Sequence, residues 1–155
     1  MRLPRPLIRF VFTSLQLLRK LVWLVTGPGR DGVHAVPLTA GGKLVLVRLT
    51  YARGWRLPGG GRKRGETEQQ GAIRELREEI GLVGHGSVER VDHALPSPRP
   101  RGDRSAMFLV RDVDYRPFQS LEVEEVREFD PAHLPEDLSP STRETLDKLA
   151  MRRDE

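Results

Sequence analysis

Short runs rich in Val, Leu and aromatic residues, bounded by Gly and Pro, predict strands after residue 31. The segments GVHAVPLT (residues 32–39) and KLVLVRLTY (residues 43–51) are of this kind, and the glycine turn between them has the spacing of a hairpin. Three later segments read in the same way: residues 87–95, 104–113 and 122–129. The run PSPRPRGD at residues 96–103 separates two of them and predicts an extended, exposed loop.

A helical period predicts a helix over residues 67–80. Ile73, Leu76 and Ile80 recur at the spacing of one helix face, which provides an apolar stripe for packing. Gly81 follows this segment and is a natural C-terminal stop, because glycine adopts the left-handed conformation that ends many helices.

Two further segments complete the predicted elements. Residues 139–152 predict a closing helix, with Ser139 or Ser141 as its N-cap. The short extended stretch WRLP (residues 55–58) runs into three consecutive glycines, residues 59–61, which we expect to form a loop.

The first 30 residues differ from the rest of the chain. Residues 7–25 are largely apolar, but a polar stripe at spacings of 4, 3 and 4 predicts an amphipathic helix. The stripe consists of Arg9, Thr13, Gln16 and Lys20. We therefore divide the chain into a basic amphipathic N-terminal helix and linker (residues 1–30) and one domain (residues 31–155). The apolar face of the helix could be covered by the domain, by a second copy in a homodimer, or by a membrane surface.

Composition and charge restrict the class of protein. A chain of 155 residues with 37% hydrophobic and 31% charged residues fits one globular domain. It contains no cysteine, which excludes disulfides, thiolate metal sites and a cysteine nucleophile. We expect a cytoplasmic protein, with peripheral membrane contact through residues 7–25 as the alternative. The net charge of +4 is uneven, because residues 1–30 carry six basic residues and no acid.

Three carboxylates fall on one face of the predicted helix at residues 67–80. Glu75, Glu78 and Glu79 stand at i, i+3 and i+4, in the last turns, where acidic side chains oppose the helix dipole and repel one another. Each effect costs a few tenths of a kcal/mol. Clustered oxygen ligands suit a hard divalent cation, Mg²⁺ or Mn²⁺, which binds phosphate oxygens and activates water. The pattern therefore indicates attack of water on phosphorus.

These residues resemble the Nudix box, a glycine followed at fixed spacings by glutamates, an arginine and a second glycine. All nine specified positions of that pattern are filled: Gly60, Glu66, Arg74, Glu75, Leu76, Glu78, Glu79, Gly81 and Leu82. The resemblance covers about residues 32–149. It implies an α+β fold, an α/β/α sandwich with a mixed β-sheet between helices. It also implies a hydrolase of phosphoric anhydride bonds that cleaves a nucleoside diphosphate linked to another group.

The resemblance also implies roles for individual residues. Glu75, Glu78 and Glu79 would be the metal ligands, together with the carbonyl of Gly60. Either Glu79 or an acid outside the box would orient or deprotonate the water. Arg74 would hold a glutamate in place and Glu66 would brace the loop. The acid outside the box has four candidates, of which we rank the first highest: Glu122, Glu124, Glu125 and Asp103.

The substrate is predicted less directly. Trp55 and Tyr51 could stack on a base, or could pack in the core. Arg62 belongs to a basic loop that could attract a polyphosphate, or could simply be solvated. Pro98 lies sixteen residues after Leu82, as a proline does in the ADP-ribose group of the family.

We therefore expect a small nucleotide, ADP-ribose-like or a nucleoside triphosphate, and keep an RNA 5′ end as a further substrate. Two other classes stay open. One is a nucleotide-binding regulatory module without turnover, and the other is a membrane-surface protein that uses its N-terminal helix.

Overall fold

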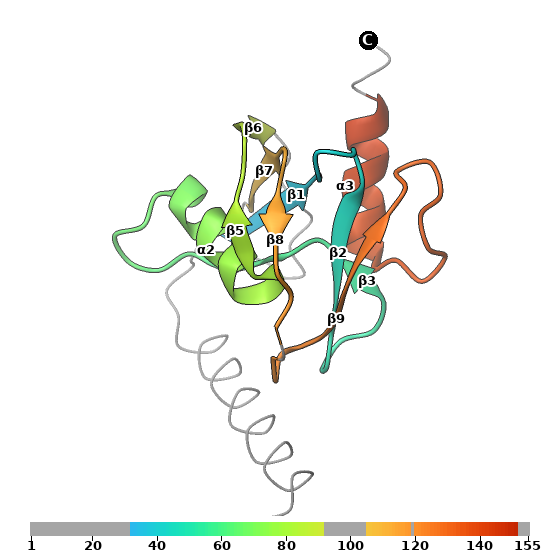
Figure 1. Ribbon diagram of the computed structural model, residues 1–155, viewed down its shortest axis with the longest axis horizontal. Helices are drawn as coiled ribbons and strands as arrows, with labels where there is room; N and C mark the ends of the chain where they lie inside the picture. Colours follow the sequence, from blue (N-terminus) through green and yellow to red (C-terminus); the bar gives the residue numbers. More distant parts are fainter. Residues whose placement is uncertain (1–31, 92–104, 119, 152–155) are drawn as a thin grey trace, which may run out of the picture.

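The computed structural model describes residues 32–91, 105–118 and 120–151 (Figure 1). Its helices are α2 (Glu68–Ile80) and α3 (Pro140–Met151). Its strands are β1 (Gly32–Pro37), β2 (Leu44–Leu49), β3 (Trp55–Arg56), β4 (Gly59–Gly61), β5 (Leu82–Gly84), β6 (Val88–Val91), β7 (Ala106–Val110), β8 (Asp114–Tyr115) and β9 (Val123–Phe129).

The predicted N-terminal helix and the whole proline-rich segment, residues 96–103, lie outside the described residues. The division of the chain at residues 30 and 31, the homodimer and the membrane contact therefore remain predictions. Neither described helix is long and apolar enough to span a membrane.

The strands form a mixed arrangement, as predicted. A four-stranded sheet has the order β4-β1-β7-β6, with β1 parallel to β7 and antiparallel to β4. A three-stranded antiparallel sheet has the order β3-β2-β9, and β5 pairs with β8. The short strands β5 and β8 have no counterpart among the sequence-based predictions.

The predicted hairpin of residues 32–39 and 43–51 is wrong as a strand pair. Only a single bridge, Leu38 to Leu44, joins the two segments. A strand has two edges, and both edges of each strand are used elsewhere: β1 lies between β4 and β7, and β2 between β3 and β9. The tight turn is present, with the Gly42 amide donating to the Thr39 carbonyl over 2.8 Å, but the strands then separate into different sheets.

The three glycines predicted to form a loop instead form strand β4, which is a second correction. Gly60 lies opposite Val33 in the antiparallel pair with β1. A side chain at Gly59 would place its Cβ 2.4 Å from the carbonyl oxygen of Val33. Glycine is therefore used here because it lets β4 approach its neighbour closely, rather than because it bends the chain.

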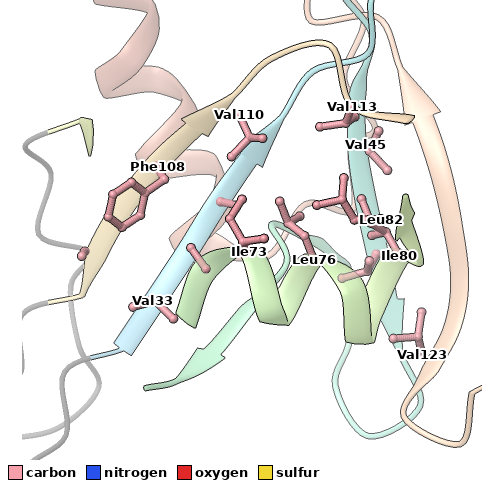
Figure 2. Packing of buried hydrophobic residues seen from close by; sticks show 14 of the residues in the cluster. Val33, Val45, Ile73, Leu76, Ile80, Leu82, Phe108, Val110, Val113 and Val123 are labelled. Atoms are coloured by element: carbon pink, nitrogen blue, oxygen red, sulfur yellow. The ribbon is translucent and has the colours of Figure 1, made fainter. Parts of the chain in front are cut away.

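Two cores on opposite faces of the strands establish the sandwich. Alternate residues of β2 point in opposite directions: Val45 and Val47 belong to the core under α2, whereas Leu44 and Leu46 belong to the core under α3. Figure 2 shows the first core, in which the α2 stripe packs against the strands. That stripe is Ile73, Leu76 and Ile80, as predicted. The strands thus lie between α2 and α3, which confirms the α+β fold.

The ends of α2 follow from local sequence. Thr67 is the N-cap, and its hydroxyl accepts a hydrogen bond from the amide of Gln70 over 3.1 Å while the Gln70 side chain accepts from the Thr67 amide. Gly81 ends the helix with φ +74°, as predicted. In α3, the amide of Thr142 donates to the hydroxyl of Ser139, so Ser139 rather than Ser141 is the cap.

Thr67→Ala is expected to lower the free energy of unfolding by about 1 kcal/mol, because it removes the side-chain partner of the Gln70 amide. Urea unfolding followed by circular dichroism measures this. Thr67→Ser keeps the hydroxyl and is the matched control, expected to stay within about 0.5 kcal/mol of the wild type. Equal stability of Thr67→Ala and the wild type would show that the cap contributes nothing.

Candidate active site

The acidic face of α2 lies directly against β4. Glu79 is 7% exposed, and its Oε2 accepts a hydrogen bond from the amide of Gly59 over 2.9 Å. A Cβ added at Gly60 would lie 2.6 Å from the Oε1 of Glu75. The glycines of β4 therefore bring its backbone within contact distance of two carboxylates, and any larger residue at Gly60 would displace one of them.

Arg74 connects the parts of this site. Its Nε and Nη2 donate to the two carboxylate oxygens of Glu66, over 2.7 and 3.1 Å. Its Nη1 donates to Glu75 over 2.7 Å and to Glu78 over 3.2 Å, and its Nη2 also donates to the carbonyl of Gly61 over 2.9 Å. One planar guanidinium thus joins the loop before α2, the helix itself and β4.

The two carboxylates nearest to Arg74 have pKa values shifted in opposite directions. The hydrogen bond from Arg74 lowers the pKa of Glu66 below its usual value. Burial raises the pKa of Glu75; the hydrogen bond and charge of Arg74 oppose this rise, and the charges of Glu78 and Glu122 add to it. Burial is therefore the main reason why the pKa of Glu75 is raised even though this residue is paired with an arginine.

Glu122 is the acid outside the box that the fold brings near this site. Its charge acts on Glu75, and its Oε1 accepts a hydrogen bond from the hydroxyl of Tyr51 over 2.8 Å. Burial raises the pKa of Tyr51, and the charges of Glu122 and Glu79 raise it further. Tyr51 and Glu122 are 71 residues apart, so no spacing in the sequence could have predicted their contact.

The other candidates for the outside acid are placed differently. Glu125 pairs with Arg48 and Arg127, and Glu124 is exposed. Asp103 lies outside the described residues. Among the four, Glu122 is the one with a described electrostatic effect on a box glutamate.

The residues predicted to bind substrate have mixed placements. Trp55 is 1% exposed in the core under α3, where its indole packs at 4.9 Å from the ring of Phe129 and lies beneath the guanidinium of Arg48. This burial supports packing, the alternative to base stacking. Arg62 is half-buried, and its Nη1 donates to the carbonyl of Glu66 over 3.2 Å.

The loop before α2 borders an open hollow of about 780 Å³ that is lined by residues 62–68. Lys63, one of these residues, reaches Glu78 over 3.4 Å. The hollow therefore adjoins the acidic face through Lys63 and Glu66, although Glu75, Glu78 and Glu79 do not line it.

The donor chemistry fits a hard divalent cation. Glu75, Glu78, Glu79 and Glu122 offer only oxygen atoms, and two of them, Glu75 and Glu78, share the guanidinium of Arg74. Across the described residues, no three His, Asp or Glu side chains converge as a ready metal cluster. The reason lies in Arg74, since the carboxylates of Glu75 and Glu78 are both turned toward its Nη1.

Comparison with known proteins places this site in a family. The family model of the NUDIX domain matches residues 28–149. The chain belongs to the Nudix family. This confirms the family predicted from the box. The matched residues include Gly60, Arg74 and all three glutamates of the acidic face.

Two curated relatives are similar over part of their length. An RNA pyrophosphohydrolase of Erythrobacter litoralis (strain HTCC2594) is 31% identical over 110 residues, which cover 58% of this chain and 67% of the relative. An RNA pyrophosphohydrolase of Hydrogenovibrio crunogenus (strain DSM 25203 / XCL-2) is 40% identical over 53 residues, which cover 34% of this chain and 32% of the relative. Thus the chain spans only about a third of the second relative.

Solved structures support the fold. The crystal structure of a MutT NUDIX hydrolase from Burkholderia pseudomallei matches 77% of this chain and 97% of that chain, with a TM-score of 0.61 and 24% sequence identity. At this identity the likeness establishes the arrangement of strands and helices, and the chemistry of this chain has to be argued from its own residues.

Glu75→Gln is expected to raise the melting temperature of the metal-free Nudix protein at neutral pH. Folding raises the pKa of Glu75, so its ionised form opposes folding at any pH above that raised pKa. The amide removes the charge and keeps an oxygen that can accept from Arg74. As the pH falls below the raised pKa, Glu75 of the folded wild type takes up a proton. The difference in melting temperature between Glu75→Gln and the wild type then becomes smaller.

Thermal unfolding in EDTA at several pH values measures this difference. Glu66→Gln is the matched variant of opposite sign, because Arg74 lowers the pKa of Glu66 and its ionised form favours folding. Its melting temperature should lie below that of the wild type at neutral pH and approach it in acid. A lower neutral-pH melting temperature for Glu75→Gln would contradict the raised pKa of Glu75.

Proposed function

We propose that this chain is a Mg²⁺- or Mn²⁺-dependent pyrophosphohydrolase that cleaves a nucleoside diphosphate linked to another group, by attack of water on phosphorus. The observation that carries the proposal is the common face of α2 that bears Glu75, Glu78 and Glu79, with Glu79 bonded to the Gly59 amide and Glu75 directly beside Gly60. Carboxylates grouped in this way would repel a phosphate substrate unless a cation accompanied it.

The proposed metal ligands are Glu75, Glu78 and Glu79, with the carbonyl of Gly60. When bound, a divalent cation would offset the negative charge of the phosphate oxygens and lower the pKa of a bound water. Arg74 acts on the protein side, since its bonds to Glu75 and Glu78 keep both carboxylates on one face of α2. Loss of Arg74 would leave these two acids to repel each other without a fixed orientation.

Glu79 and Glu122 are proposed as the residues that orient water or accept its proton. The Gly59 amide fixes one oxygen of Glu79, and the Tyr51 hydroxyl fixes one oxygen of Glu122. Each acid thus accepts a hydrogen bond that orients one of its oxygens, as a group that positions water or accepts its proton requires. Turnover by Glu79→Gln and by Glu122→Gln decides which of the two takes the proton.

The substrate is proposed to be a small nucleotide, ADP-ribose-like or a nucleoside triphosphate. A second candidate, the phosphorylated 5′ end of RNA, is favoured by two relatives, both named RNA pyrophosphohydrolase. The basic loop with Arg62 and Lys63 suits the phosphates of either substrate. The proline that resembles the ADP-ribose group, Pro98, lies outside the described residues and adds no argument from geometry.

Glu79→Gln is expected to reduce turnover by at least about a hundredfold, because the amide cannot accept a proton or offer the same charge to a cation. Product analysis is carried out with Mg²⁺, Mn²⁺ or EDTA on ADP-ribose, dinucleoside polyphosphates, nucleoside triphosphates and 5′-triphosphorylated RNA. Wild-type turnover should require the metal. Glu89→Gln is the matched control, since Glu89 is exposed on β6 and the charge change is the same.

The panel separates the functional classes. Turnover of one substrate, lost in Glu79→Gln and kept in Glu89→Gln, would establish the hydrolase and its substrate. Nucleotide binding without turnover across the panel would favour a regulatory module. Equal turnover by Glu79→Gln and the wild type would remove Glu79 from the mechanism.

Glu122→Gln is expected to reduce kcat by about a hundredfold or more if Glu122 handles the proton of water. Glu124→Gln removes the same charge two residues away from an exposed position and should stay within about twofold of the wild type. Steady-state kinetics on the substrate found by the panel measure both. Similar kinetics for the two variants would exclude Glu122 as the acid outside the box.

A further inference from the structure

Arg56 lies on the same side of the sheet as the acidic site. In the pairing of β2 with β3, Arg56 stands opposite Val47 and Trp55 stands opposite Arg48. Val47 belongs to the core under α2, whereas Trp55 belongs to the core under α3. Because neighbouring residues of a strand point to opposite faces, the side chain of Arg56 is directed to the face that carries α2.

The guanidinium of Arg56 lacks an anionic partner among the described residues. Its one hydrogen bond there is from Nη2 to the carbonyl of Arg53, over 3.3 Å. Its Nε is shielded from solvent and has no hydrogen-bond partner in the described part of the chain. By contrast, several other described arginines pair with carboxylates: Arg48, Arg74, Arg90 and Arg127. A half-buried cation without an anion is costly, since desolvation is not offset by a bond.

The neighbours of Arg56 connect it to the active site. Its positive charge acts on Tyr51, whose hydroxyl donates to Glu122 and also senses the charge of Glu79. The same charge acts on His34. Burial is the main cause that lowers the pKa of His34 to about 4, and the charge of Arg56 adds to it. His34 is therefore uncharged near neutral pH, and its Nδ1 is shielded and has no hydrogen-bond partner within residues 32–91, 105–118 and 120–151. Arg56 thus brings a positive charge close to Tyr51 and His34.

We propose that the guanidinium of Arg56 binds a phosphate group of the substrate and so completes the site opposite the carboxylates of α2. This rests on the proposed function, because the anion that Arg56 lacks in the protein is the group that a pyrophosphohydrolase must hold. A phosphate presents two oxygens that the adjacent Nε and Nη donors of an arginine contact together. The carboxylates and their cation and the guanidinium of Arg56 then act on the substrate from different sides.

A purely structural role for Arg56 makes different predictions. If the bond to the Arg53 carbonyl were its whole function, removal of the guanidinium would lower the stability of the loop between β2 and β3 and leave substrate affinity unchanged. If Arg56 binds phosphate, its removal raises KM or weakens anion binding while the melting temperature stays close to that of the wild type.

The test compares Arg56→Gln with Arg53→Gln in the full chain. Arg53 is exposed and lies three residues before Arg56, and its carbonyl survives the substitution, so each variant loses one positive charge from the same short stretch of chain. Arg56→Gln is expected to raise KM for the panel substrate, and the Kd for inorganic pyrophosphate measured by calorimetry, by about ten- to a hundredfold. Arg53→Gln should stay within about twofold of the wild type.

Arg56→Lys covers the case in which Arg56→Gln does not fold. It keeps the charge without the planar pair of donors, and it should recover only part of the affinity. Wild-type values of KM and Kd in Arg56→Gln, or in Arg56→Lys if the former is unfolded, would overturn the proposal. So would equal losses in Arg56→Gln and Arg53→Gln, which would indicate a general effect of charge.

The two proposals fail separately. If the wild type turns over no substrate of the panel, the proposed function fails, and pyrophosphate binding alone still decides the role of Arg56. If the wild type is active and Arg56→Gln has the kinetics of Arg53→Gln, the hydrolase stands and the role of Arg56 is excluded.

Discussion

The bonds of Arg74 are the constraint on which the rest of the site depends. One side chain binds Glu66 in the loop, Glu75 and Glu78 on the helix, and the carbonyl of Gly61 in β4. A lysine has a single ammonium group and could not make these contacts in one plane. The loop, helix and strand of the box therefore keep their relative positions through one guanidinium, and the acidic face stays assembled although its charges repel one another.

Packing behind the acidic face makes this arrangement precise. The opposite side of α2 buries Leu76 and Ile80, so the helix cannot roll away from the strands without exposing apolar surface. In front, Gly60 has no side chain to separate β4 from Glu75. The carboxylates are thus held between a core that fixes the helix and a glycine backbone that comes close to them.

Arg74 and Arg56 differ in how far their hydrogen-bond donors are satisfied by the protein. Arg74 satisfies its donors within the protein, whereas the Nε of Arg56 has no partner among the described residues. The first stabilises the fold of the box, and the second is a cation held ready for an anion from outside. Burial raises the pKa of Glu75, so its ionised form is also held at a cost in stability. Holding such charged groups away from water lowers the stability of the fold and leaves them available for binding.

The sequence by itself determined the features that depend on neighbours along the chain. The limits of α2 follow from Thr67 and Gly81, and the common face of its three glutamates follows from their spacing of three and four residues. The box in turn indicated the family. Tertiary structure decided the rest: β1 pairs with β4 and β7 instead of forming a hairpin, and Tyr51 meets Glu122 across 71 residues. Within one dipeptide, Trp55 enters the core and Arg56 faces the site. Such contacts join distant residues through the choice of strand partners, and a single sequence carries no local signal for that choice.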